Sequence, residues 1–274
     1  MTNPHVTSLA HEMLDAFNTG SRIAVAPSAR DGGLDLDTGY AVEAEIARLR
    51  GAAGHKVVGR KIGLANRAVW QAMKLRTLVW GSMYDDTVQH APTGRATLSV
   101  ARMRAPRVEP EIVVKLNAAP KPGAGPAEVM EAVDWMALGF EFVDCPFPDW
   151  KFQPGDFLAS LGLHAALVVG EPRSIRRGEI SALVENLAAF TSRLSKNGQV
   201  VEQGGGKNVL GSPALCLAEF AAAVPQQPGA QPLYAGELLS TGSTTPAPPV
   251  AAGERWTMEV DCLELSPLTV DLTA

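Results

Sequence analysis

The feature that most constrains the fold is a change in sequence texture at Gly54. Before it, residues 7–18 and 40–50 carry apolar side chains at helical spacing. After it, short apolar runs such as "KVVGRKIGL", "HAALVVG" and "ELLSTGS" are interrupted repeatedly by glycine and proline. Many short strands separated by turn signals are typical of a sheet-rich sandwich or roll. The sequence therefore predicts a helical N-terminal part over 1–54 and a sheet-rich catalytic body over 55–274, together forming one structural unit.

Two helices and one hairpin are expected inside this body. The segment 126–139, "PAEVMEAVDWMALG", opens with proline, carries an apolar stripe and ends at glycine, which predicts a helix. A second helix is predicted over 212–224, with Ser212 as its N-cap and proline at the next position. In "SKNGQV", Asn197 and Gly198 can both adopt positive φ, which favours a two-residue hairpin turn.

Composition and charge exclude several classes of protein. The net charge is -5, and the chain has no lysine or arginine run of the kind that binds a phosphate backbone, so we expect no nucleic-acid partner. Its three cysteines lack CxxC spacing, which argues against a disulfide framework and a thiolate zinc site. The start lacks the pattern of a signal peptide, and no stretch reaches the roughly 18 apolar residues of a membrane span. We expect a cytoplasmic protein without a membrane partner.

Two glutamates stand one residue apart in the apolar run "RVEPEIVVKL". Strand side chains alternate between faces, so Glu109 and Glu111 project together, about 7 Å apart along the backbone. Their mutual repulsion suggests a cation between them. The alternative is a solvated strand face, with the apolar neighbours Val108, Ile112 and Val114 turned to the core.

A third carboxylate follows in "GFEFVDCPFPDW", where Glu141 stands between two phenylalanines. A charge in so apolar a run needs a partner, because burying an unpaired charge costs much free energy. Three carboxylates from two strands would form a site for a hard cation such as magnesium, manganese or calcium. A salt bridge from Glu141 to a nearby arginine or lysine explains the pattern equally well.

Seven blocks in order give the chain a family resemblance: "VVGRKIGLA", "WGSMYDD", "RVEPEIVVKL", "FEFVDCPFPDWK", "KNGQVVEQGGGKNVLGSP", "LLSTGSTTP" and "AAGERW". The chain resembles the hydratase/decarboxylase branch of the fumarylacetoacetate hydrolase superfamily, which includes 2-keto-4-pentenoate hydratase and 2-oxo-3-hexenedioate decarboxylase. The resemblance implies an α+β fold, with a sheet-rich mixed β roll of the fumarylacetoacetate hydrolase C-terminal-domain type and a helical N-terminal part. It places Glu109, Glu111 and Glu141 on the metal ligands, usually for Mg2+ or Mn2+, and it implies a homo-oligomer.

The resemblance also implies an activity, namely a metal-dependent lyase acting on a small-molecule 2-oxo acid. The favoured interpretation is a hydratase that adds water to a 2-hydroxy-2,4-dienoate or 2-oxo-alkenoate in aromatic or related catabolism. The first alternative is a 2-oxo-3-hexenedioate decarboxylase, followed by an acylpyruvate-type C-C hydrolase. A homologue that binds metal or ligand without turnover is the remaining alternative.

Catalytic roles follow from the same resemblance. Lys61, in "GRKIGL", matches the active-site lysine, which would bind the substrate carboxylate or relay a proton; by itself it reads as a surface lysine at a strand end. Asp86, in "SMYDDT", matches an acid of the family by position, and would otherwise be an ordinary turn carboxylate.

Substrate contacts are expected in two further segments. "LLSTGSTTP" matches a loop whose small hydroxyl residues contact the substrate carboxylate, which points to Thr241, Gly242 and Ser243; a glycine- and serine-rich turn is the alternative. His164 lies where other members carry small polar residues near the site, although a lone histidine before an apolar strand is more often a satisfied core group.

Several family positions differ at the substrate end. A family "DSR" segment reads "DCP" here, so Cys145 and Pro146 replace a hydroxyl and an arginine, and a polar "ADNAS" segment reads "ASLGL", with Leu161 and Leu163. Without that arginine a second, distal carboxylate is harder to hold, which favours a monoacid substrate. Three other arginines are candidates for its replacement: Arg60, Arg67 and Arg104.

Overall fold

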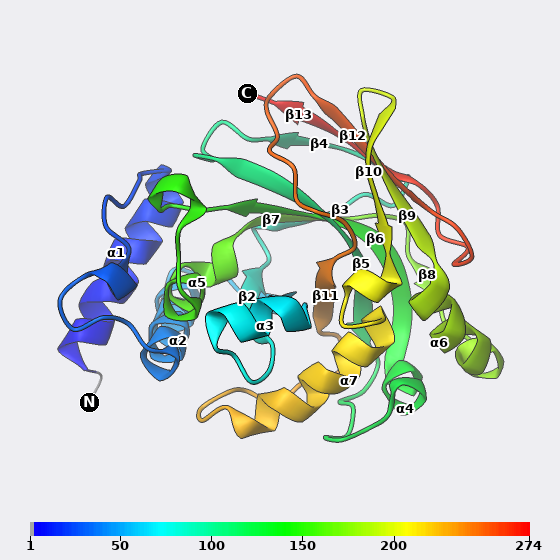
Figure 1. Cartoon of the computed structure of the whole chain (residues 1–274), viewed down its shortest axis with the longest axis horizontal. Helices are drawn as coiled ribbons and strands as arrows, with labels where there is room; N and C mark the ends of the chain where they lie inside the picture. Colours follow the sequence, from blue (N-terminus) through cyan, green and yellow to red (C-terminus); the bar gives the residue numbers. More distant parts are fainter. Residues whose placement is uncertain (1–2) are drawn as a thin grey trace.

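A computed structural model describes residues 3–274 and shows a mixed α+β fold, which confirms the predicted fold class (Figure 1). The helices are α1 (Pro4–Thr19), α2 (Leu36–Ala52), α3 (Arg67–Met73), α4 (Pro126–Glu131), α5 (Pro154–Ala159), α6 (Ile180–Ala189) and α7 (Pro213–Ala223). The strands are β1 (Val57–Gly63), β2 (Val79–Tyr84), β3 (Val88–His90), β4 (Arg95–Ser99), β5 (Pro106–Leu116), β6 (Val133–Asp144), β7 (His164–Val169), β8 (Arg173–Ser174), β9 (Thr191–Lys196), β10 (Gln199–Gly205), β11 (Leu238–Ser243), β12 (Arg255–Val260) and β13 (Leu268–Thr273). Short 3-10 turns are η1 (Pro27–Ala29), η2 (Pro148–Trp150), η3 (Leu161–Leu163), η4 (Arg177–Glu179), η5 (Gly206–Asn208) and η6 (Val224–Gln226).

The two N-terminal helices begin with side-chain caps and lie together at the left of Figure 1. The Asn3 side chain accepts a hydrogen bond from the backbone of His5 at the start of α1, and the Asp35 side chain accepts one from Thr38 in α2. Such caps satisfy backbone N–H groups that the first helical turn leaves free. The apolar faces of α1 and α2 join the same hydrophobic cluster as the body.

The larger sheet carries the candidate site. Its strand order is β2-β1-β11-β5-β6-β7-β3, and β8 pairs with β6. The pairs β1–β11 and β3–β7 are parallel, and the other neighbours are antiparallel. The long strands β5 and β6 form its centre, while the smaller sheet, β10-β9-β12-β13-β4, lies toward the top of Figure 1.

The helical stretch Gly206–Gln226, which includes α7, is long and apolar enough by length and composition to cross a membrane. More than half of its most apolar window is buried inside the protein, at 56%. Leu217 and Phe220 of α7 belong to the hydrophobic core. The stretch is therefore buried as a core helix is. Core helices of folded proteins can meet the same criteria of length and composition as membrane-spanning helices.

Two of the three local predictions for the body are confirmed, and the third is wrong in part. The helix at 212–224 is confirmed as α7, where Ser212 accepts a hydrogen bond from Leu215. The hairpin is confirmed as well, because Asn197 and Gly198 have φ values of 50° and 82° between β9 and β10. The predicted helix over 126–139 is wrong beyond α4, because β6 starts at Val133. An apolar stripe at this spacing also suits a buried strand, and pairing with β5 overrides the local helical preference.

Candidate metal centre

The register of two central strands brings the three predicted glutamates together. Glu109 on β5 stands directly opposite Glu141 on β6, and Glu111 lies two residues further along the same face of β5. Each of the three offers a carboxylate oxygen within 4.8 Å of the oxygens of the other two. The arrangement is the carboxylate cluster that a hard divalent cation requires.

Glu111 is fully buried, and one of its oxygens is anchored by β11. Its Oε2 accepts hydrogen bonds from Ser240 Oγ at 2.5 Å and from the backbone N–H of Gly242 at 2.9 Å. The register of β11 against β5 shifts between Ser240 and Ser243, and Gly242 has a φ of 108°, so an irregular backbone aims its N–H at the carboxylate. The other oxygen, Oε1, has no hydrogen-bond partner within residues 3–274.

Glu141, like Glu111, has one oxygen with polar partners and one without. Its Oε1 lies 3.1 Å from Lys61 Nζ and 3.1 Å from His164 Nδ1. Its Oε2 is buried and finds no hydrogen-bond partner in the described part of the chain. Because an unpaired buried carboxylate oxygen is costly, these two orphaned atoms indicate that the cluster fits a cation.

The electrostatics of the cluster also fit a cation. Burial raises the pKa of Glu111 well above its ordinary value, and repulsion by Glu141 and Glu109 adds to the effect. Burial likewise raises the pKa of Glu109. For Glu141, burial acts in the same direction, but the attraction of Lys61 and a hydrogen bond from His164 outweigh it and lower the pKa. Three carboxylates thus face one ammonium, which leaves an excess of negative charge.

Lys61 is held in its charged form. Burial would lower its pKa, but the fields of Glu141, Glu109 and Glu111 raise it above the ordinary value. Its side chain is only 3% exposed, and its Nζ also lies 3.8 Å from Glu109 Oε2.

A cavity of about 450 Å³ opens beside the cluster and is lined by Lys61, Glu109 and Glu111. Further polar lining comes from Asn66, Asn208, Ser243 and Thr245. Apolar lining comes from Ile62, Leu64, Ala65, Val143, Trp150, Phe152, Phe157, Leu163 and Pro246. Of the four positions where polar family residues are replaced, only Leu163 is among the described residues of this lining.

The other predicted substrate contacts separate into two groups. Gly242 and Ser243 line the cavity. Thr241 is fully buried, and its Oγ1 donates a hydrogen bond to the carbonyl of Ile112, so it faces away from its two neighbours. His164 is not among the described residues of the lining, because its ring is buried against Glu141. Substrate contact by Thr241 and His164 therefore has no support in this arrangement.

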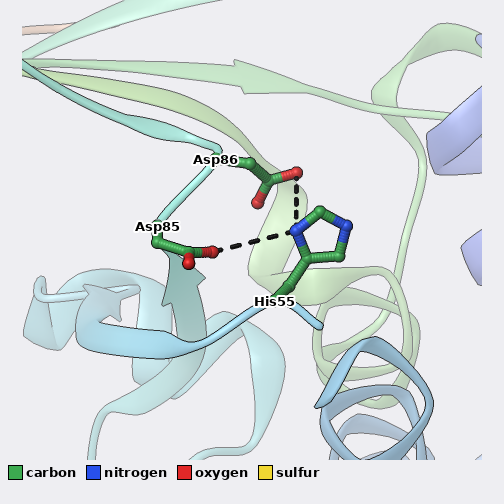
Figure 2. A group of neighbouring side chains, drawn as sticks. All are labelled: His55, Asp85 and Asp86. Atoms are coloured by element: carbon green, nitrogen blue, oxygen red, sulfur yellow. Dashed lines mark ion pairs between the residues drawn. The ribbon is translucent and has the colours of Figure 1, made fainter. Parts of the chain in front are cut away.

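Asp86 lies in a different cluster, with His55 and Asp85 (Figure 2). His55 Nδ1 is 3.4 Å from Asp86 Oδ2 and 3.8 Å from Asp85 Oδ1. The buried guanidinium of Arg50 forms an ion pair with Asp86. Asp86 is not among the described residues that line the cavity, and its side-chain partners are Arg50 and His55.

Sequence reasoning missed Ser240, Asn208 and Phe157, which contact Glu111 or line the cavity. Ser240 and Gly242 stand on either side of Thr241 in one strand. The alternation of strand faces therefore predicts that Ser240 and Gly242 share a face and that Thr241 points the other way. The three arginines considered for a distal carboxylate have other partners: Arg60 pairs with Glu237, Arg104 pairs with Asp144, and Arg67 stacks over Trp70.

Comparisons with known proteins identify relatives of the chain. The chain is 31% identical to a 2-hydroxyhexa-2,4-dienoate hydratase of Comamonas testosteroni over 231 residues, covering 83% of both chains. It is 30% identical to a 4-oxalocrotonate decarboxylase of Pseudomonas sp. (strain CF600), covering 80% of this chain and 79% of the relative. The solved structure of 4-oxalocrotonate decarboxylase from Pseudomonas putida G7, complexed with magnesium and adipate, aligns with a TM-score of 0.87 at 26% identity, covering 99% of this chain and 98% of that one. No protein-family model matches the chain.

Fold and site together define an α+β protein with a carboxylate-rich cavity of the kind that holds a hard divalent cation. More particularly, the chain belongs to the hydratase/decarboxylase branch of the fumarylacetoacetate hydrolase superfamily.

Proposed function

We propose that this protein is a divalent-metal-dependent lyase, and specifically a hydratase that adds water to a 2-hydroxy-2,4-dienoate or the related 2-oxo-alkenoate. The observation that carries the proposal is the pair of buried, unpartnered oxygens, Glu111 Oε1 and Glu141 Oε2, in a cluster that borders a cavity. The hydratase relative with 31% identity supports this chemistry. The reaction belongs to the catabolism of aromatic or related compounds.

The residues present fit a divalent cation of the Mg2+ or Mn2+ type. Glu109, Glu111 and Glu141 would hold it, because an all-oxygen donor set suits these ions, with further positions left for water and substrate oxygens. The bound ion supplies Lewis-acid stabilisation of negative charge on the oxygens of a 2-oxo acid.

Lys61 is the residue that we assign to the substrate. Its ammonium stays protonated and borders the cavity, so it binds a carboxylate or an enolate oxygen and delivers a proton rather than removing one. Ser243 lines the same cavity, but its Oγ donates a hydrogen bond to the Thr245 carbonyl at 2.8 Å. Ser243 therefore offers the substrate an acceptor rather than its proton.

The apolar wall favours a monoacid over a diacid. A distal carboxylate placed against Val143, Phe152 and Leu163 would lose its hydration without gaining a charged partner. An alkenyl tail gains contact with the same surface. The hydratase is therefore preferred to a decarboxylase of 2-oxo-3-hexenedioate.

The decarboxylase is kept as a second candidate because of two observations. The aligned decarboxylase structure holds adipate, a diacid. In this chain, the guanidinium carbon of Arg107 stacks 4.4 Å above the ring of Trp150, which lines the cavity. Arg107 is thus a candidate partner for a distal carboxylate.

A substrate panel separates the candidates. The protein is incubated with Mg2+ or Mn2+ and with 2-hydroxypenta-2,4-dienoate, 2-hydroxyhexa-2,4-dienoate or 2-oxohex-3-enedioate, while dienol absorbance and CO2 are followed. Loss of dienol without CO2 supports the hydratase, and CO2 release supports the decarboxylase. Cleavage of an acylpyruvate, included as a fourth substrate, would instead indicate a C-C hydrolase. No turnover with retained Mn2+ binding would indicate a non-catalytic homologue and overturn the proposal.

We further propose that the protein acts as a homo-oligomer in the cytoplasm, as the family resemblance implies. Size-exclusion chromatography with light scattering tests the oligomer. A monomer at micromolar concentration would contradict it.

A further inference from the structure

We propose that His164, held in place by Thr87, is a positioning residue that fixes Glu141 for the cation. In this arrangement His164 binds Oε1 of the carboxylate and leaves Oε2 free as the ligand atom. The inference rests on the cation site of the proposed function. It assigns His164 a role exerted through Glu141, in place of the substrate contact that the sequence predicted.

The geometry of the ring supports this role. His164 is the first residue of β7 and lies beside β6, in register with Val143. The His164 and Glu141 side chains are both fully buried. Nδ1 lies 3.1 Å from Glu141 Oε1, and Nε2 lies 2.9 Å from Thr87 Oγ1. Both ring nitrogens are therefore engaged, which fixes the position and the tilt of the imidazole.

The hydrogen-bond network determines which nitrogen faces the carboxylate as a donor. An ionised carboxylate only accepts hydrogen bonds, so Nδ1 must carry a proton where it meets Glu141. The Thr87 hydroxyl lies 2.9 Å from Nε2 and 3.1 Å from the Tyr84 carbonyl, so it is placed to donate to either of them. When it donates to Nε2, the neutral ring carries its proton on Nδ1, the nitrogen that faces Glu141.

Lys61 contacts the same oxygen but serves more than one group. It also lies near Glu109 and borders the cavity, so its ammonium is shared between the carboxylates and any bound substrate. His164 does not line the cavity, and the partners of its ring are Glu141 and Thr87. When Lys61 engages a substrate, His164 is the donor that keeps Oε1 in place. A hydrogen bond that orients a metal ligand typically changes metal affinity by about 10–100-fold when it is lost.

Two nearly isosteric substitutions test the inference. In His164→Asn the amide nitrogen takes the place of Nδ1 and can still donate to Glu141, whereas in His164→Gln it takes the place of Nε2 and reaches Thr87 instead. The measurement is the Kd of the substrate-free protein for Mn2+, from the electron paramagnetic resonance signal of free Mn2+. We expect His164→Gln to weaken Mn2+ binding by about 10–100-fold, and His164→Asn to stay within about 3-fold of the unchanged protein.

Kinetics on the same variants separate positioning from substrate contact. A positioning role predicts that excess Mn2+ restores much of the turnover of His164→Gln, with the KM for the dienoate little changed. A raised KM at saturating Mn2+ with unchanged Mn2+ affinity would overturn the inference, and so would equal losses of affinity in both variants, which would indicate packing alone.

A second pair covers the case in which His164→Gln fails to fold. Thr87→Val removes the hydroxyl that fixes the ring, while Thr87→Ser retains it, so only the valine variant should weaken Mn2+ binding. Equal affinities in this pair would overturn the inference. If the unchanged protein itself does not bind Mn2+, the proposed function fails as well. If the unchanged protein and every variant bind Mn2+ equally well, the role of His164 is refuted while the proposed function stands.

Discussion

The ammonium of Lys61 lies 3.1 Å from Glu141 Oε1, the same oxygen that His164 contacts. Both donors converge on one atom, and Oε2 of the same carboxylate is left without a partner among residues 3–274. Glu111 shows the same division, with two donors on Oε2 and none on Oε1. Each buried glutamate is thus held at one oxygen and offers the other, an arrangement that fixes ligand atoms before a cation arrives.

Replacing Glu111 by glutamine should weaken Mn2+ binding by at least about 100-fold and abolish turnover. The substitution keeps the shape of the side chain but removes an anionic donor, and losing a direct ligand should cost at least as much as losing a hydrogen bond to one. Isothermal titration with Mn2+ measures the effect. Glu43→Gln is the matched control, because Glu43 is hydrogen bonded to Ser82 and lines a different cavity. Comparable losses in both variants would argue against a specific site.

The stability of the metal-free protein should fall as pH rises above the ordinary range of glutamate. Burial raises the pKa values of Glu109 and Glu111, so the folded state binds their protons more tightly than the unfolded state, and this contribution is lost as pH rises through the folded values. Glu141 has the opposite sign, because its lowered pKa gives stability that is lost only as pH falls below its ordinary value.

Metal binding should reverse this loss, because the ion takes the place of the protons. The gain in Tm on adding Mn2+ in place of a chelator should therefore be larger at pH 7.5 than at pH 5.5. Thermal unfolding followed by circular dichroism at both pH values checks this. A gain that shrinks with rising pH would mean that these carboxylates are not the ligands.

Lys61→Met should lower turnover by about 100-fold or more while leaving Mn2+ binding intact or tighter. Methionine keeps most of the volume but removes a proton donor, whose loss typically costs about 100- to 10,000-fold in rate. It also removes a positive charge that competes with the cation for Glu141 and Glu109. Steady-state kinetics and Mn2+ titration on the same preparation check both parts. Weakened Mn2+ binding would instead show that Lys61 mainly holds the cluster together.

The sequence was most informative where a residue's role depends on local periodicity. Alternation in a strand places Glu109 and Glu111 on one face without any knowledge of the fold. The convergence of Glu141 depends on the register of β5 against β6, a long-range pairing that local pattern does not determine, and only the family resemblance supplied it. The same pairing explains why the segment after Glu131, which was predicted to be helical, is a strand.

The orientation of neighbouring side chains was the least predictable part of the site. Which hydroxyls of "STGS" face Glu111 depends on the register shift in β11, and the structure selects Ser240 and turns Thr241 away. The ring of His164 faces a carboxylate because β7 lies beside β6, whereas the sequence shows only a histidine before an apolar run.

Asp86→Asn should leave the turnover rate nearly unchanged and lower stability. Asp86 is the ion-pair partner of Arg50, whose side chain is 3% exposed, so the substitution leaves a buried guanidinium without its counter-charge. A loss of about 1–3 kcal/mol in the free energy of unfolding is expected. Urea unfolding and steady-state kinetics check the two parts. If turnover instead drops by two orders of magnitude while stability is unchanged, the catalytic role inferred from family position would be restored.

Leu163→Asn should relax the preference for a monoacid. With its apolar wall, the unchanged protein is expected to favour 2-hydroxyhexa-2,4-dienoate over 2-oxohex-3-enedioate by about 100-fold in kcat/KM, because a distal carboxylate would be desolvated without a partner. Leu163 lines the cavity with a φ of 60°, a left-handed conformation that asparagine tolerates better than leucine. The new amide would give a carboxylate a hydrogen-bond donor at little backbone cost, so the ratio should narrow by about 10-fold. Leu161→Asn is the matched control, because Leu161 has a φ of 55° and is buried outside the described lining. If both substitutions change the ratio equally, the wall at Leu163 does not set substrate choice.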